Sequence, residues 1–181
     1  LTGARLKAAD AIYAGIADAY VPSERLETLK DRIAGGAPLT EALKEVAEEE
    51  GPAPLSAIQE DISRHFSKGS VTEIIASLRA DGGEWAVKTA ETIEAKSPTS
   101  TLVAFRQVRE GAKLEFEECM KLEFRLINGF IQGHDFYEGV RAVVIDKDQA
   151  PKWKPATLAD MTAGDVDSYF VPLGDNELTF D

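Results

Sequence analysis

The chain has little cysteine, histidine and positive charge for its length. Its 181 residues contain one cysteine, Cys119, and two histidines, and 20 Lys and Arg residues stand against 32 Asp and Glu. A single cysteine excludes an intrachain disulfide and a metal site built from several cysteines within this sequence. Phosphate groups are bound by clustered Lys and Arg, so the formal net charge of −12 argues against nucleic acid and anionic membranes as partners.

Long hydrophobic runs are also missing. No stretch reaches the roughly 20 apolar residues that a bilayer-spanning helix needs. The first residues carry neither the basic block nor the apolar block of a signal peptide. The sequence starts abruptly at Leu1 rather than at Met. We therefore expect no membrane span and no signal peptide in it, and we expect it to be a piece of a longer chain.

Helix signals dominate what is present. Hydrophobic residues make up 44% of the chain and charged residues 29%, which is ordinary for a globular domain with its own core. Helix-capping patterns occur at Ser70-Val71-Thr72-Glu73, Ser97-Pro98 and Thr162-Ala163-Gly164-Asp165. We expect helices over residues 8–14, 23–34, 39–49, 54–66, 70–81, 84–95, 98–111 and 114–132, another from about 136, and a short one ending near 170. The only weak strand pattern lies at Ala17–Val21.

The longest expected helix carries one apolar stripe, which consists of Phe116, Met120, Phe124, Ile127 and Ile131. Such a stripe most often packs into the core. Contact with a cofactor, or with another subunit, is the alternative. Glu115, Glu118 and Arg125 lie off the stripe, and we expect them to be solvated.

The segment after this helix holds the polar residues that are candidates for chemistry. His134 is either a general base or pH switch, or a residue that caps the next helix. Asp135 and Glu138 either have a catalytic role or complement the dipole in the first turn of a helix, and Arg141 either pairs with one of them or binds phosphate. Trp153, among prolines, either stacks on adenine or anchors a tail. In each case we favour the structural interpretation.

Two other residues call for the same comparison. His65 lies alone in an amphipathic helix, and we expect a partly exposed structural residue rather than a catalytic one. Cys119 follows Glu117 and Glu118, and neighbouring carboxylates raise the pKa of a thiol. We therefore expect no nucleophilic role for this cysteine.

Three patches resemble the 3-hydroxyisobutyryl-CoA hydrolases, a branch of the crotonase (enoyl-CoA hydratase/isomerase) superfamily. The first comprises Leu1-Thr2-Gly3, Ala8-Ala9-Asp10-Ala11 and Gly15-Ile16-Ala17-Asp18, and the second is Ser97-Pro98-Thr99-Ser100. The third and most specific is Gly133 to Pro155, with its Asp-Lys-Asp and Pro-Lys-Trp-Lys-Pro motifs. The resemblance implies that this chain is the C-terminal part of such an enzyme.

The resemblance implies both the fold of this chain and the location of the catalytic groups outside it. We expect an all-α, multi-helix domain, with the family's N-terminal ββα spiral absent. Residues 1–22 would end the crotonase core, and residues 23–181 would form the helical domain, with an acidic insert at about 25–79. The family's catalytic carboxylates and the backbone donors of its oxyanion hole would precede Leu1. No catalytic residue is therefore assigned to this chain.

One contact with coenzyme A is implied by the resemblance. Many crotonases place a Phe and a Lys from the terminal helix near the CoA of a neighbouring subunit. Aligned on Glu138-Gly139, these positions hold Val143 and Asp146 here, so both expected residues are replaced. Lys147, one residue later, is the one candidate for CoA binding, and no metal ligand is expected.

The implied parent function is thioester hydrolysis of 3-hydroxyisobutyryl-CoA in valine degradation, with a lid or assembly role for this inactive part. Coenzyme A enters only within the acyl-CoA substrate, bound through the missing N-terminal domain, and no other cofactor is expected. An enoyl-CoA hydratase or isomerase parent and a non-catalytic oligomerisation module remain alternatives. Homo-oligomers are an open expectation, and the location would be cytoplasmic, or the mitochondrial matrix in a eukaryote.

Overall fold

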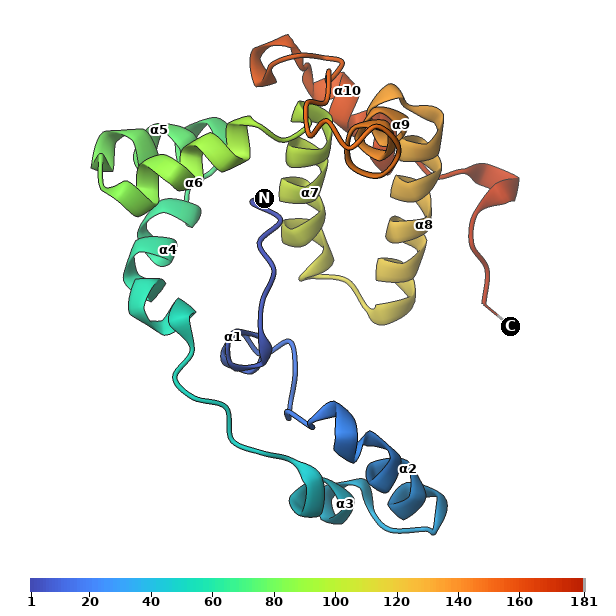
Figure 1. Cartoon of the computed structure of the whole chain (residues 1–181). Coiled ribbons are helices and arrows are strands. Elements are labelled where there is room, and N and C mark those ends of the chain that lie inside the picture. The colour runs from blue at the N-terminus through green and yellow to red at the C-terminus, as the bar shows by residue number, and fades with distance from the viewer. Residues whose placement is uncertain (181) are drawn as a thin grey trace. The chain divides into compact units, whose positions relative to one another are not determined.

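The protein is built from helices in two compact units (Figure 1). The computed structural model describes residues 1–180 and contains no strand among them, only an isolated antiparallel bridge between Tyr20 and Glu48. The expected all-α class is thus confirmed. One unit comprises Gly3–Ser67, and the other comprises Leu1–Thr2 with the chain from Lys68 onward. The expected boundary at residue 22, and the assignment of residues 1–22 to a crotonase core, stay predictions.

The unit Gly3–Ser67 consists of short helices. They are α1 (Ala8–Tyr13), η1 (Ser23–Arg25), α2 (Leu26–Ala34), α3 (Leu39–Val46), η2 (Pro54–Ile58) and α4 (Gln59–Phe66). Helix α2 packs on α3, and α1 packs on η2. The backbone N–H of Leu55 donates to the Asp10 carboxylate at 2.8 Å, which ties η2 to α1.

Two expectations for this unit fail for identifiable reasons. The helix predicted over residues 39–49 ends at Val46, because the Glu48 N–H donates to the Tyr20 carbonyl oxygen at 3.0 Å instead of continuing the helix. His65 is not partly exposed but buried, with 2% of its surface accessible. It lies three residues after Ile62, which is partly buried, on the same side of α4.

The second unit holds the longer helices. They are α5 (Val71–Asp81), α6 (Glu84–Glu94), α7 (Pro98–Gly111), α8 (Phe116–Gln132), α9 (His134–Val140), the π-helical turn η3 (Arg141–Ile145), η4 (Leu158–Asp160), α10 (Ala163–Asp167), η5 (Ser168–Phe170) and η6 (Gly174–Asn176). The predicted caps are confirmed: Ser70, Ser97 and Thr162 accept hydrogen bonds from the N–H groups of Glu73, Ser100 and Asp165. Asp165 completes the capping box at α10.

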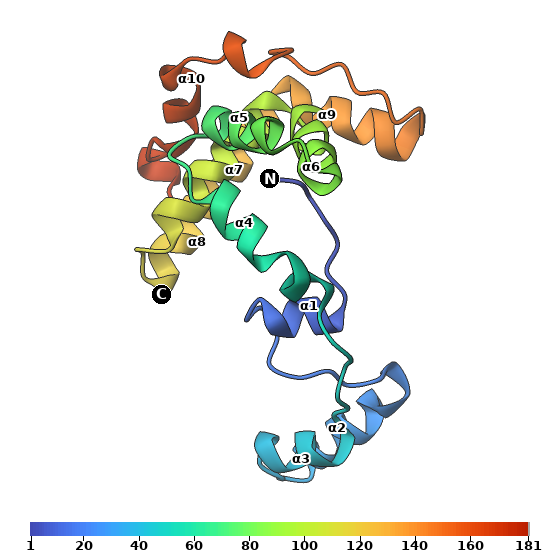
Figure 2. The same cartoon turned by 90° about the vertical axis from the view of Figure 1, so that its left-hand side faces the viewer.

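Helices α5 and α6 pack side by side in both views (Figures 1 and 2). The spacing of Val71, Ile74, Ile75 and Leu78 predicts one buried face of α5. Val71, Ile74 and Leu78 are buried, Ile75 is partly buried, and Ile93 of α6 is buried as well. Gly82, with a φ of 72° that side chains disfavour, ends α5.

A second core lies between α7, α8 and the segment that follows α10. Val103, Leu122, Leu126 and Phe170 form its centre, and Phe130, Val166 and Tyr169 pack around them. The Tyr169 ring lies against Gly129, where an added Cβ would approach the ring to 2.6 Å. A glycine is therefore required at this crossing.

Helix α8 does not bury the stripe that the sequence predicts. Phe116, Met120 and Ile127 are 75%, 37% and 46% exposed, and Ile131 is exposed too. The buried face carries Leu122 and Leu126 instead. Arg125 is correspondingly not solvated: its side chain is 20% exposed and its Nε donates to Glu177 at 2.9 Å. Helix α8 has two apolar faces, and periodicity alone does not tell which one the domain covers.

Candidate functional site

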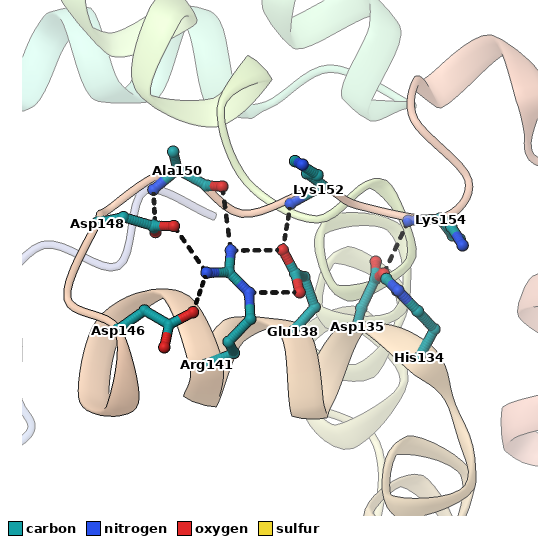
Figure 3. Close-up of polar contacts among 9 residues, drawn as sticks. All are labelled: His134, Asp135, Glu138, Arg141, Asp146, Asp148, Ala150, Lys152 and Lys154. Atoms are coloured by element: carbon teal, nitrogen blue, oxygen red, sulfur yellow. Dashed lines mark hydrogen bonds and ion pairs between the residues drawn. The ribbon is translucent and has the colours of Figure 1, made fainter.

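The candidate site is the polar face of α9 together with the tail that returns along it, residues 146–154. In Figure 3 the side chains of Asp135, Glu138 and Arg141 point toward this tail. The three residues lie three apart, so they share one side of the helix. The tail then leads back to α10 (Figure 2). The residues that carry the most specific sequence pattern therefore contact one another.

Arg141 is the centre of this arrangement. Its Nε and Nη2 donate to both oxygens of Glu138, at 2.9 and 2.8 Å. Its Nη1 donates to Asp146 and to Asp148, each at 2.7 Å, and its Nη2 also reaches the Ala150 carbonyl oxygen at 3.3 Å. One guanidinium thus fixes the start of the tail at several points, using the planar fork of donors that only arginine has. The predicted pairing of Arg141 with a helix carboxylate is confirmed.

These contacts hold the groups in their charged forms. Hydrogen bonds from Arg141, and then from the Lys152 N–H, lower the pKa of Glu138 to about 2. Arg141 likewise lowers the pKa of Asp148. The pKa of Arg141 is itself raised, chiefly by Glu138. None of these groups therefore titrates near neutral pH, which makes them positioning groups rather than proton-transfer groups.

Asp135 is the buried end of the same face, with 8% of its surface accessible. It accepts hydrogen bonds from the Ser97 hydroxyl at 2.6 Å and from the Lys154 N–H at 2.8 Å. The Nδ1 of His134 lies 3.0 Å from the same carboxylate. Asp135 thus links the start of α7, the start of α9 and the end of the tail. Both of its oxygens are occupied by protein donors, which fits a structural role.

Trp153 fastens the tail to a third element. Its Nε1–H donates to the carbonyl oxygen of Ala95, just after α6, at 3.0 Å. Its ring lies over Gly139, at ordinary contact distance from where a Cβ would be. The interpretation of Trp153 as a tail anchor is confirmed.

Lys147 lies at the outer turn of this arrangement. It is exposed and has a φ of 57°, in the left-handed region, and Gln149 adopts a φ of 55°. Its neighbours Asp146 and Asp148 both bind Arg141. Asp135, Glu138 and Arg141, with the groups of the tail that they bind, are called the clamp below. The clamp fixes the backbone of Lys147, and this residue is exposed. A CoA contact through Lys147 stays a prediction.

A cleft of about 390 Å³ opens beside Asp135. It is lined by residues of α7, α8, α9, the tail and η5, including Thr99, Phe130, His134, Lys154 and Tyr169. Burial, and then the charge of Asp135, raise the pKa of the Tyr169 hydroxyl. His134 is the first helical residue of α9, whose N-cap is Gly133, so the expectation that His134 caps this helix is wrong.

The remaining candidates are also located. The Cys119 thiol donates to the Gly111 carbonyl oxygen at 3.4 Å and is partly buried. Within residues 1–180 no group of three or more His, Cys, Asp or Glu side chains is arranged to hold a metal ion. Over the same residues no helix is long and apolar enough to cross a membrane.

Two parts of the clamp were not predicted from the sequence. Asp146 and Asp148 share Arg141, and only the left-handed turn between them makes this geometry available. Ser97 and Asp135 lie 38 residues apart in the sequence, and no local pattern connects them. The Asp-Lys-Asp motif was the one available signal for the first of these.

The sequence of this chain is similar to that of 3-hydroxyisobutyryl-CoA hydrolases over nearly its whole length. It is 45% identical to the mitochondrial 3-hydroxyisobutyryl-CoA hydrolase of Danio rerio and 40% identical to that of Homo sapiens. These alignments cover 98% and 99% of this chain and 49% of each hydrolase. The chain therefore spans about half the length of these relatives.

Two solved structures also superpose on this chain over nearly its whole length. A carnitinyl-CoA dehydratase from Mycobacterium thermoresistibile superposes with a TM-score of 0.87 at 36% identity, and an enoyl-CoA hydratase from Rhodobacter sphaeroides with 0.81 at 32%. Each match covers 99% of this chain and 52% of the other. The model of the enoyl-CoA hydratase/isomerase family matches residues 1–170. The chain belongs to the enoyl-CoA hydratase/isomerase family, and its helices correspond to about half of a crotonase-like protein.

Proposed function

We propose that this chain is the helical C-terminal part of an acyl-CoA thioester hydrolase that acts on 3-hydroxyisobutyryl-CoA in valine degradation. The observation that carries the proposal is the 40–45% identity to proteins named as that hydrolase, sustained over 98–99% of this chain. The tail clamp built by Arg141 lies within the segment that most resembles this branch. The same names support a mitochondrial location in a eukaryote, and we propose a cytoplasmic location in other organisms.

The proposed reaction consumes water and an acyl-CoA. Water adds to the thioester carbonyl carbon, the C–S bond breaks, and the sulfur leaves as the protonated thiol of coenzyme A while the carboxylic acid is released. Such a reaction needs hydrogen-bond donors aimed at the developing oxyanion and a carboxylate that activates water. Arg141 keeps Glu138 and Asp148 ionised and fully engaged, so these carboxylates do not meet the second need. The catalytic groups would lie in the other half of the enzyme.

The helical part would then act as lid and assembly element. Its clamp fixes the tail against α9, and its exposed apolar residues offer a surface for the rest of the enzyme. We expect the 181-residue chain alone to be inactive. No cofactor is required beyond the coenzyme A within the substrate.

The test compares this chain with a family-length chimera. The chimera joins this chain to the half of the Danio rerio hydrolase that it does not cover. Release of CoA from 3-hydroxyisobutyryl-CoA, followed with a thiol reagent, should occur with the chimera and not with this chain alone. Turnover by the chain alone would refute the placement of the catalytic groups. A correctly folded chimera that releases no CoA would count against the hydrolase assignment.

A hydratase or isomerase parent is the second candidate. It is favoured by the close superposition on proteins named carnitinyl-CoA dehydratase and enoyl-CoA hydratase. The same chimera separates the two candidates, because hydration of crotonyl-CoA removes the absorbance of its conjugated double bond without releasing a thiol.

A non-catalytic oligomerisation module is the third candidate, and light scattering of the 181-residue chain tests it. A monomer at high concentration would exclude that third candidate.

Lys147 is the proposed contact for coenzyme A. Its exposed ammonium group, on a backbone fixed by the clamp, is free to meet a phosphate by charge attraction. In the chimera, Lys147→Gln should raise KM several-fold and leave kcat unchanged, which is the signature of a lost binding contact. Lys88→Gln on α6 is the matched control. An unchanged KM would remove Lys147 from the binding site.

A further inference from the structure

The cleft beside Asp135 is lined by charged side chains of both signs. Its volume of about 390 Å³ lies at the small end of the range for ligand pockets, which is about 300–1,000 Å³. All of its lining residues belong to the unit that runs from Lys68 onward. The cleft is therefore formed within one compact unit, and its size suits a ligand of few atoms.

Lys154 brings a positive charge to this cleft. Its backbone N–H donates to Asp135 at 2.8 Å, which fixes the root of its side chain (Figure 3). Asp135 itself is engaged by the Ser97 hydroxyl and by the Nδ1 of His134 as well. The Lys154 ammonium group has no hydrogen-bond or ion-pair partner among residues 1–180, and the residue is exposed. It is thus available to a carboxylate in the cleft.

Tyr169 offers the cleft a second donor. Its ring packs on Phe130 with centroids 4.9 Å apart, and its hydroxyl lies 3.4 Å from where a Cβ of Gly133 would be. Burial, and then the charge of Asp135, raise the pKa of this hydroxyl, so at neutral pH it is a neutral O–H donor. Within the described residues 1–180 nothing accepts its hydrogen bond. An oxygen of a ligand can take that place.

Two carboxylates supply the opposite charge. Asp160 and Asp165 line the cleft from η4 and α10, and both are exposed. Each uses its Oδ2 to accept from the threonine that precedes its helix, Thr157 or Thr162. The Oδ1 atoms remain for a ligand. Hydrogen bonds from Thr162 lower the pKa of Asp165, so this carboxylate is ionised at neutral pH and attracts an ammonium group.

We propose that this cleft binds a small zwitterion, namely an α-amino acid with an aliphatic side chain. Lys154 and Tyr169 hold the carboxylate of the ligand, and Asp160 and Asp165 hold its ammonium group. The rest of the lining includes Phe130, Phe136 and Met161, which give the aliphatic side chain an apolar contact. The site does not depend on the proposed reaction. Because Lys154 belongs to the tail and Asp165 to α10, the ligand would also join these two segments.

The test compares three ligands by isothermal titration calorimetry of the 181-residue chain. L-leucine carries both charges, 4-methylpentanoate lacks the ammonium group, and 3-methylbutylamine lacks the carboxylate. L-leucine should bind with a Kd of about 1 mM or below. It should bind at least about fivefold more tightly than either analogue, because each charged group adds a charge-assisted contact. An analogue that binds as tightly as L-leucine overturns the proposal, and so does a lack of saturable binding by L-leucine up to about 20 mM.

Variants with matched controls locate the binding. Lys154→Gln should weaken L-leucine binding about fivefold or more and leave 3-methylbutylamine binding unchanged, whereas Lys154→Arg should keep L-leucine binding. Lys152→Gln, in the same tail but outside the cleft, is the control. Asp165→Asn retains an oxygen for the cap at α10 and should weaken L-leucine binding by a similar factor, with Asp175→Asn as its control. Equal effects of a variant and its control would overturn the proposal, and urea midpoints verify that each variant is folded.

The chimera decides whether the cleft is open in the family-length protein. L-leucine should bind the chimera with the same Kd as the 181-residue chain, within about twofold. Loss of binding in the chimera would show that the other half covers the cleft, and would overturn the proposal. If the 181-residue chain does not unfold cooperatively, the chimera alone is titrated. Binding without CoA release keeps this site and removes the proposed activity, whereas CoA release without binding does the reverse.

Discussion

Glu138 of α9 and Arg141, the first residue of the following turn η3, form a two-pronged ion pair with N–O distances of 2.9 and 2.8 Å. Glu138 also accepts the Lys152 N–H at 2.7 Å. The pair therefore connects the helix to the tail that runs back along it. The pair is therefore one of the contacts that position Lys147 and the segment up to Trp153.

The first prediction concerns acid stability. The pKa of Glu138 is lowered from 4.5 to about 2 in the folded protein, so its contribution is complete above pH 4.5 and is lost as pH falls toward 2. Glu138→Gln removes this contribution. The difference in urea midpoint between parent and variant should be largest at neutral pH and should shrink below pH 4.5. A difference that is constant with pH would contradict the role of the charged pair.

The second prediction separates the two functions of Trp153. Trp153→Phe keeps an aromatic ring over Gly139 but loses the hydrogen bond to Ala95, which should cost about 0.5–1.5 kcal/mol. Trp153→Ala also loses the ring contacts and should cost about 2 kcal/mol or more. Urea unfolding gives both values, and limited trypsin cleavage after Lys152 reports release of the tail. Equal stability of the two variants would mean that the ring does not anchor it.

The third prediction compares neighbours on α8. Leu126→Ala should cost about 2–5 kcal/mol because it leaves a cavity among Val103, Leu122 and Phe170. Ile127→Ala should change the stability of the 181-residue chain by no more than about 0.5 kcal/mol, since its side chain is exposed. Thermal or urea unfolding of the two variants checks this. A large loss from Ile127→Ala would show that the predicted stripe is covered after all.

The fourth prediction tests the turn at Lys147. Its φ of 57° is costly for branched side chains, so Lys147→Val should destabilise the chain by about 1–2 kcal/mol. Lys147→Gly accepts this conformation without that cost. The urea midpoint of Lys147→Gly should therefore be higher than that of Lys147→Val. The reverse order would mean that the turn does not keep a left-handed residue at this position.

Local signals in the sequence predicted most of the secondary structure. Ser70, Ser97 and Thr162 cap helices because each places a hydroxyl oxygen next to N–H groups that the first helical turn leaves unpaired. Val71, Ile74 and Leu78 are buried because their spacing gives α5 a single apolar side. The ion pair between Arg141 and Glu138 could likewise be predicted from their spacing of three residues. The family pattern in Gly133–Pro155 is also a property of the sequence alone.

Tertiary structure decided which of several compatible faces is covered. Helix α8 offers both Leu126 and Ile127 on apolar sides, and the packing of Tyr169 against Gly129 selects the first. His65 is buried, which the spacing in its helix permits but does not require. Ser97 reaches Asp135 only because the chain brings the starts of α7 and α9 together. Helix periodicity determines which residues share one side of a helix. Only the packing of segments that are distant in the sequence determines which side is buried.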